Sequence, residues 1–175
     1  MDHIVQLHIR GIIQDTLIMM YNQDEGCFPK LHYYSIVCLS EAFIRKFHLY
    51  VYIDWGIVSR HQVLSESFIR EFQDKVDWYD ISWSQKLSES FIREFRDEVE
   101  WSPISERQKL SEPFIIEHES KVDWERISIW QVLSEPFIKR CMYRLCWKNI
   151  VYHQVLSDSF VKKYNSKKNW NLSLT

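Results

Sequence analysis

The sequence has 175 residues, of which 46% are hydrophobic and 15% aromatic, and its formal net charge at pH 7 is -2. This composition excludes an intrinsically disordered chain, and the length is sufficient for a domain with a hydrophobic core. Only 3 glycines are present, and none follows Gly56. Because hairpin-rich β folds depend on glycine at their turns, this scarcity favours helices.

The beginning of the sequence carries no recognisable targeting signal. Its first residues are not the basic start of a signal peptide, and Gln6, His8 and Arg10 interrupt the apolar residues around them. No segment approaches the ~18 apolar residues of a transmembrane helix. The 4 cysteines form no CxxC pair, which indicates reduced thiols. We therefore expect a cytoplasmic protein that is neither secreted nor transmembrane and has no contact with a membrane.

Residues 1–38 differ in pattern from the rest of the chain. Apolar residues are dense between Ile4 and Ile18, and the segment 24–29 has the composition of a turn or linker. We interpret 1–38 as an N-terminal cap or a degenerate repeat, helical around 3–20.

Residues 39–175 are dominated by one short unit that recurs six times. Its first part reads L-S-E-x-F-I-x-x-F-x-x-x-V, as in 87–99, and its second part reads D-W-x-x-I-S-x-x-Q. The period is 23 residues apart from a first step of 25. The units begin at Leu39, Leu64, Leu87, Leu110, Leu133 and Leu156.

The first part of each unit predicts a helix of ~11 residues. Phe91, Ile92, Phe95 and Val99 fall within roughly a 100° arc of a helix, whereas a strand would place them on both faces. The serine after each leucine lies where an N-cap belongs, and the acidic residue that follows suits the positive end of the helix dipole. The expected caps are Ser40, Ser65, Ser88, Ser111, Ser134 and Ser157.

The second part predicts a shorter helix of ~8 residues. In the second unit Ile81, Ser82 and Gln85 share one narrow face with Trp78. The residue before the tryptophan is Asp in three units and Asn in the last, which are good caps. Glu100 and Cys146 occupy the same position and are expected to cap less well.

Three prolines support this division into two helices. Pro113 and Pro136 fall two residues after a proposed cap serine, and Pro103 falls two after Trp101. Proline is tolerated in the first turn of a helix, where its missing N–H has no intrahelical partner. Each unit is therefore predicted to be an αα-hairpin, and the fold class is an all-α solenoid of short helix-turn-helix repeats with a period of 23 residues.

Equivalent residues of successive hairpins should stack into ladders through the core. One predicted ladder contains the six tryptophans from Trp55 to Trp170, and another contains the six phenylalanines from Phe43 to Phe160. The glutamine that ends five of the units is polar on an apolar face. We expect its amide to satisfy an otherwise unpaired backbone group between hairpins.

The pattern LSExFI…F…VDWxxIS…Q, as in LSESFIREFQDKVDWYDIS, resembles the 23-residue tandem-repeat proteins of giant DNA viruses that infect amoebae. The resemblance covers about residues 39–170. It implies a viral origin and expression in the cytoplasm of an infected host cell, and it implies no particular activity, cofactor or catalytic residue. Two units depart from the pattern, because 39–63 carries two extra residues and 133–155 has diverged.

The sequence predicts no enzyme, no cofactor and no metal site. It contains no GxSxG, P-loop or GxGxxG motif, and its carboxylates recur at caps and solvent positions. His118 and Cys141 replace the same phenylalanine in consecutive units, with Cys146 and His153 nearby. Their spacing matches no zinc site, so we interpret them as packing residues.

The leading functional hypothesis is a non-enzymatic scaffold that binds another protein. Aromatic residues dominate interface energetics, and four of them occupy positions that vary between units. The candidate contact residues are Tyr79, Trp83, Trp130 and Tyr152.

Nucleic-acid binding, above all to single-stranded RNA, is the alternative. The units 64–86, 87–109 and 110–132 carry net charges of -2, -2 and -3, whereas 133–155 and 156–175 each carry +3. Basic residues at the C-terminal end alternate with aromatics, and helical repeats can read one base per unit. A phosphate-tracking groove should stay basic along its length, which favours the protein-binding hypothesis. A redundant paralogue without a partner is a third hypothesis.

Overall fold

A computed structural model describes residues 39–49 and 53–165 of the protein, and every regular element within these ranges is a helix. The segment 1–38, predicted to be a cap or a degenerate repeat, lies outside the described residues. None of the described helices combines the length and the hydropathy that crossing a bilayer requires. The helices are α2 (Glu41–Phe47), α3 (Trp55–His61), α4 (Glu66–Glu71), α5 (Trp78–Ser84), α6 (Glu89–Glu94), α7 (Trp101–Arg107), α8 (Glu112–Glu117), α9 (Trp124–Trp130), α10 (Glu135–Arg140), α11 (Trp147–His153) and α12 (Asp158–Asn165).

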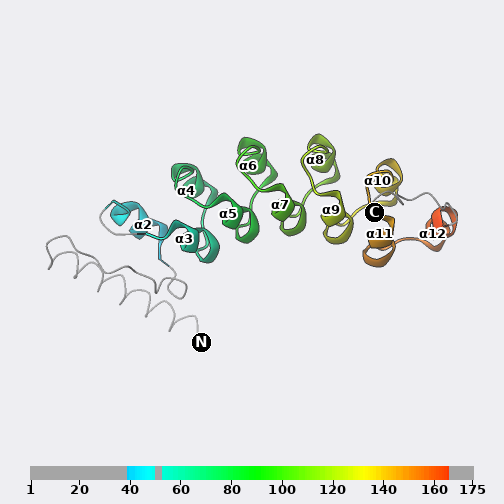
Figure 1. The fold of residues 1–175 in the computed structure, drawn as a ribbon, viewed down its shortest axis with the longest axis horizontal. Coiled ribbons are helices and arrows are strands. Elements are labelled where there is room, and N and C mark those ends of the chain that lie inside the picture. The colour runs from blue at the N-terminus through cyan, green and yellow to red at the C-terminus, as the bar shows by residue number, and fades with distance from the viewer. Residues whose placement is uncertain (1–38, 50–52, 166–175) are drawn as a thin grey trace, which may run out of the picture. The chain divides into compact units, whose positions relative to one another are not determined.

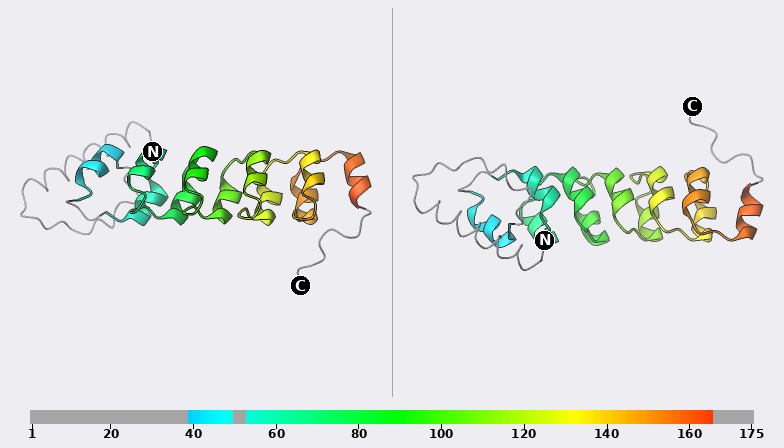
Figure 2. Two further views of the ribbon diagram at one scale, coloured as in Figure 1. Left: turned by 90° about the horizontal axis from the view of Figure 1, so that it is seen from above. Right: turned by 90° about the horizontal axis from the view of Figure 1, so that it is seen from below.

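The chain divides into two compact units, residues 1–85 and 86–175. These two compact parts are called unit 1 and unit 2 from here on, and the 23-residue units of the sequence are called repeats one to six, numbered from Leu39. Unit 1 contains repeats one and two, and unit 2 contains repeats three to six. In unit 2 the first helices α6, α8 and α10 form one row, and the second helices α7, α9 and α11 form another (Figure 1). Within each unit the hairpins follow one another in chain order (Figure 2). The predicted all-α solenoid of helix-turn-helix repeats is confirmed.

Each first helix begins at a serine cap, as predicted. In repeat three the Oγ of Ser88 accepts the N–H of Phe91 at 3.2 Å, and the equivalent bond recurs in the other five repeats. The Oγ accepts one of the N–H groups that have no partner inside the helix.

The first helices are shorter than the sequence predicted, since α6 has 6 residues and ends at Glu94. Phe95 leaves the helical conformation with φ -107° and ψ 30°, and the N–H of Val99 reaches its carbonyl at 3.0 Å to close a turn. The indole N–H of Trp101 donates to the carbonyl of Arg96 in this turn at 3.0 Å. The chain needs these residues to reverse direction, although Val99 is buried as predicted.

The second helices of repeats one to five each have 7 residues and begin at the predicted caps. In repeat two the Oδ1 of Asp77 accepts the N–H of Asp80 at 2.9 Å. Asp54 and Asp123 make equivalent bonds. Glu100 and Cys146 make no side-chain cap bond, which confirms the prediction that they cap less well.

The core is formed by apolar residues of both helices together with a buried serine. Ile104 and Ser105 of α7 are fully buried, and α7 packs against α9 as α9 packs against α11. The hydroxyl of Ser105 donates to the carbonyl of Trp101 at 2.7 Å and accepts the N–H of Asp123 in the next repeat at 2.9 Å. The side chain of Ser105 therefore makes one hydrogen bond within its own helix and one to the backbone at the start of the second helix of the following repeat.

The five tryptophans that begin α3, α5, α7, α9 and α11 are half-buried, so the predicted core ladder of tryptophan is only partly correct for them, and its last member, Trp170, lies outside the described residues. Trp101 lies against the next repeat, with ring centroids 6.3 Å from Phe114 and 4.9 Å from His118. Trp55 and Trp147 lie in the same way over the phenylalanine of the repeat that follows. The indole N–H of Trp78, Trp101 and Trp124 donates to a carbonyl of the turn that precedes it.

The recurrent glutamine connects two successive repeats, and its amide binds backbone groups between hairpins as predicted. In unit 2 the Nε2 of Gln131 donates to the carbonyls of Ser105 and Gln108 at 2.9 and 2.8 Å, and its Oε1 accepts the N–H of Leu110 at 3.0 Å. Gln131 is only 5% exposed. One side chain thus satisfies a carbonyl inside the preceding second helix, a carbonyl at its end and the first N–H of its own repeat.

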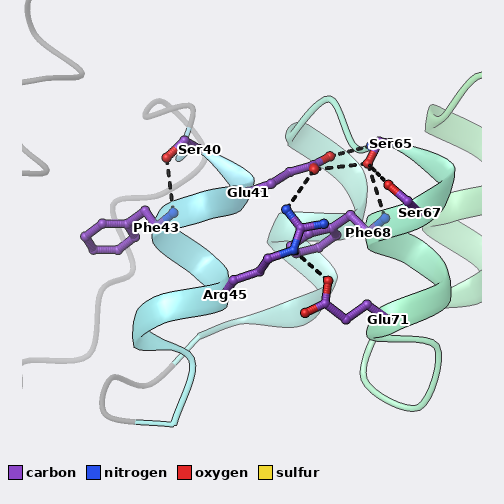
Figure 3. A network of polar contacts seen from close by, with 8 residues as sticks. All are labelled: Ser40, Glu41, Phe43, Arg45, Ser65, Ser67, Phe68 and Glu71. Carbon is purple, nitrogen blue, oxygen red and sulfur yellow. Dashed lines mark hydrogen bonds and ion pairs between the residues drawn. The ribbon is translucent and has the colours of Figure 1, made fainter.

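A second connection between repeats comes from the glutamate that follows the cap serine. Glu112 accepts the backbone N–H of Ser134, the cap of the next repeat, at 2.7 Å. In unit 1 Glu41 accepts both the backbone N–H and the hydroxyl of Ser65, at 2.5 and 3.0 Å (Figure 3). In an ordinary capping box a glutamate of the same helix binds this N–H. Here the preceding repeat supplies the carboxylate, so a single hydrogen bond both caps the helix and connects the two repeats.

Candidate protein-binding surfaces

The residues that recur in most repeats are largely occupied within the fold. The cap serine, the following glutamate, the tryptophan N–H, the buried serine and the glutamine each bind backbone groups, as the preceding contacts show. A surface for another molecule must therefore be formed by the positions that vary between repeats.

In unit 1 the structure brings two of the candidate contact residues together. Tyr79 and Trp83 lie one helical turn apart on α5, and their rings are stacked with centroids 6.4 Å apart and an interplanar angle of 7°. Tyr79 is 54% exposed, whereas Trp83 is half-buried. The pair presents a flat aromatic surface of which Tyr79 is the more accessible member.

In unit 2 the other two candidates lie on neighbouring second helices. Trp130 ends α9 with 57% of its surface exposed, and Tyr152 on α11 is 85% exposed. His153 is equivalent to Trp130 one repeat later and lies beside Tyr152, with ring centroids 5.7 Å apart. Two successive repeats thus present exposed rings at the ends of their second helices.

Exposed valines follow these rings within three residues in the sequence, and sequence reasoning missed them. Val132 and Val155 directly follow the glutamines of repeats four and five and are 92% and 100% exposed. Val63 holds the same position in unit 1 and is 93% exposed, whereas repeats two and three have lysine there. The alternation between Val and Lys was the available signal, because a position that accepts lysine faces solvent.

Charge pairing divides unit 2 into two parts. In repeats three and four, cations bind carboxylates of the adjacent repeat. The Nη2 of Arg93 is 2.8 Å from Glu117 and the Nζ of Lys121 is 2.6 Å from Asp97. The hydrogen bond from Lys121 holds the pKa of Asp97 below its usual value. Arg126 pairs in the same way with Glu106 of the preceding repeat.

The cations of repeats five and six are arranged differently. Within the described part of unit 2, four exposed cations on α10 and α12 form no ion pair with a carboxylate. They are Lys139, Arg140, Lys162 and Lys163. Arg144 does pair, with its Nη2 3.4 Å from Glu119. These four cations without a carboxylate partner among the described residues therefore all lie on first helices, α10 and α12.

The histidine and cysteine that replace the core phenylalanine are packed in apolar surroundings. The ring of His118 stacks on Phe114 with centroids 4.4 Å apart, and Cys141 is 3% exposed. Burial raises the pKa of the Cys141 thiol. Among the described residues no group of three or more His, Cys, Asp or Glu side chains could hold a metal ion. The absence of a metal, a cofactor or an enzymatic activity stays a prediction.

Comparisons with protein-family models, with curated protein sequences and with solved structures found no match for this chain.

Proposed function

We propose that this protein is a non-enzymatic helical repeat scaffold that binds another protein through the aromatic and aliphatic surface of repeats four and five. The observation that supports the proposal is the exposure of Trp130, Val132, Tyr152 and Val155 on successive repeats of unit 2. Val132 and Val155 are equivalent residues, so the exposed apolar groups recur at the repeat spacing. Exposed aromatic residues with aliphatic neighbours are typical of interface centres.

The resemblance to tandem-repeat proteins of amoeba-infecting viruses suggests where such a partner would be encountered. The same proposal therefore places the protein in the cytoplasm of an infected host cell. The partner is a viral or host protein of that compartment.

Affinity purification from the native cell, followed by mass spectrometry, tests the proposal. The wild-type chain should recover a specific protein, and the double substitution Trp130→Ser and Tyr152→Ser should reduce that recovery about tenfold or more. Tyr79→Ser is the matched control, since it removes an exposed ring from unit 1 and should leave the recovery unchanged. The melting temperature of each variant should stay close to that of the wild type, because the three rings are exposed.

Two results would contradict the proposal. One is equal recovery of the partner by the wild type and the double variant. The other is the absence of any specific protein in repeated purifications, which would favour a redundant paralogue without a partner.

Binding of single-stranded RNA or another nucleic acid by the basic C-terminal repeats is a second candidate function. The observation that favours it is the set of unpaired cations on α10 and α12, together with the exposed rings of Tyr143 and Tyr152. Binding that falls steeply as salt concentration rises would support this candidate.

A further inference from the structure

The row of first helices contains a cation–carboxylate ladder that can be defined residue by residue. In unit 1 the Nε of Arg45, five residues after its cap serine, lies 2.6 Å from Glu71, six residues after the next cap (Figure 3). In unit 2 Arg93 and Glu117 occupy the same two positions and are 2.8 Å apart. The fold thus places position five of one first helix beside position six of the next.

An aromatic ring lies beneath each of these ion pairs. The guanidinium carbon of Arg45 is 5.1 Å from the ring centroid of Phe68, and that of Arg93 is 4.8 Å from Phe114. Both phenylalanines are fully buried core residues of the following repeat. The cation is therefore held over a ring while its remaining N–H groups face a carboxylate.

The junction between repeats five and six has the same backbone but a different charge pattern. Position five of α10 is Lys139, and position six of α12 is Lys163. Lysine thus stands where Glu71 and Glu117 stand in the paired junctions. Phe160 still supplies the buried ring of the following repeat. A junction that elsewhere contains one cation and one carboxylate here contains two cations.

The carboxylate on the same helix does not pair with Lys139. Glu135 accepts the backbone N–H of Ser157 at 2.6 Å, the inter-repeat bond described above. Glu41 makes the same bond and also pairs with Arg45, whereas within the described part of unit 2 no ion pair joins Glu135 to Lys139.

By the register of the paired junctions, Lys139 and Lys163 are the two cations of this junction. Arg140 is at position six of α10, which corresponds to the side of the preceding repeat, and Lys162 is at position five of α12, which corresponds to the opposite side. Two adjacent cations without an intervening carboxylate repel each other and favour an anionic ligand from outside.

We propose that the α10–α12 junction is a docking site for an acidic segment of the protein partner, whose carboxylates take the place that Glu71 and Glu117 hold elsewhere. This inference rests on the proposed function, since it names the chemistry of the partner. A peptide is favoured over a nucleic acid because the cations at position five of α2 and α6 bind carboxylates, and because repeats three and four carry net charges of -2 and -3. The basic site is therefore too short for an extended phosphate backbone.

Fluorescence anisotropy of the purified full chain tests this site directly. The probe is a fluorescein-labelled peptide of alternating Glu and Gly, and the control probe has Gln in place of Glu. The Glu peptide should bind at low salt and be released as salt is raised, whereas the Gln peptide should not bind. No partner from the cell is needed, so this result is independent of the purification experiment.

The decisive variant is Lys163→Glu, which restores the ladder by giving Lys139 an intramolecular carboxylate. It should weaken binding of the Glu peptide about tenfold and raise the melting temperature by about 1–3 °C. Lys148→Glu is the matched control, because it makes the same charge change at an exposed position of α11. That variant should retain binding within about threefold.

Besides a failure of the Glu peptide to bind, three outcomes would overturn the proposal. Equal losses for Lys163→Glu and Lys148→Glu would show attraction to net charge alone. Tighter binding of a single-stranded RNA oligonucleotide than of the Glu peptide at the same salt would assign the site to nucleic acid. A dimer that sedimentation velocity detects in the wild type and not in Lys163→Glu would identify a second copy of the chain as the occupant. If the aromatic variants lose the cellular partner while peptide binding fails, the proposed function stands and this site does not.

Discussion

Within unit 2, repeats three and four differ from repeats five and six in charge and not in backbone connections. Glu89 binds the cap serine of repeat four just as Glu135 binds the cap serine of repeat six. Yet Arg93 is paired with Glu117 in the first pair of repeats, whereas the equivalent positions in the second pair are Lys139 and Lys163. The comparison teaches that the scaffold and the recognition chemistry are specified by separate sets of residues.

The largest expected effect tests whether the scaffold extends through both regions. Gln131→Ala should lower the free energy of unfolding by about 3 kcal/mol, because it leaves two carbonyls and one N–H without their buried partner. Gln154→Ala should cost less, about 1–2 kcal/mol, because Gln154 makes the equivalent three bonds but is half-buried. Chemical denaturation measures both values. A negligible change in the free energy of unfolding at both sites would mean that the glutamine does not stabilise the stacking of repeats.

The second effect concerns the aromatic contacts between repeats. Trp101→Ala should cost about 2–3 kcal/mol, less than for a fully buried ring, since the indole is half-exposed. Trp130→Ala should cost less than Trp101→Ala, because Trp130 is 57% exposed, whereas Trp101 stacks on both Phe114 and His118. Thermal denaturation of the two variants would rank them, and the reverse order would contradict this account of the inter-repeat contacts.

The smallest effect tests the paired charges of repeats three and four. Asp97 is ionised at neutral pH, and Lys121 holds the pKa of that carboxyl below its unfolded value, so the pair stabilises the fold above about pH 4. This contribution is lost as pH falls through the folded pKa. Asp97→Asn should therefore lower the melting temperature by about 1–2 °C at pH 7, and the difference should shrink in acid and in high salt.

Glu98→Gln is the control for this pair. Glu98 is an exposed neighbour of Asp97 and forms no ion pair within the part of unit 2 that the structure describes. Its substitution should leave the melting temperature unchanged at every pH. Equal effects of both substitutions would mean that net charge, and not the Lys121 contact, determines the stability.

The local pattern of the sequence was sufficient to predict most of the scaffold. Serine and aspartate caps depend on contacts within three residues, so Ser88 and Asp77 could be assigned from spacing alone. The role of Gln131 followed from a polar residue on an apolar face. The length of α6 could not be predicted in this way. The apolar residues keep a helical period up to Val99, but the helix ends at Glu94 and the next residues form a turn that accepts the indole N–H of Trp101.

The candidate surface was predicted less completely than the scaffold. Tyr79, Trp130 and Tyr152 are exposed, as a contact residue must be, but Trp83 is half-buried against Tyr79. The exposed valines escaped notice because an apolar residue beside a buried glutamine is indistinguishable from core by type alone.

The sequence by itself determined the repeat, its two helices and their caps, because each depends on residues close in the chain, and it marked the glutamine as a polar residue on an apolar face. Only the tertiary structure decided which residues of successive repeats meet. Position five of one first helix lies beside position six of the next because the packing of core side chains sets the offset between hairpins. That register makes the Arg93–Glu117 contact an ion pair and brings Lys139 and Lys163 to a junction without a carboxylate.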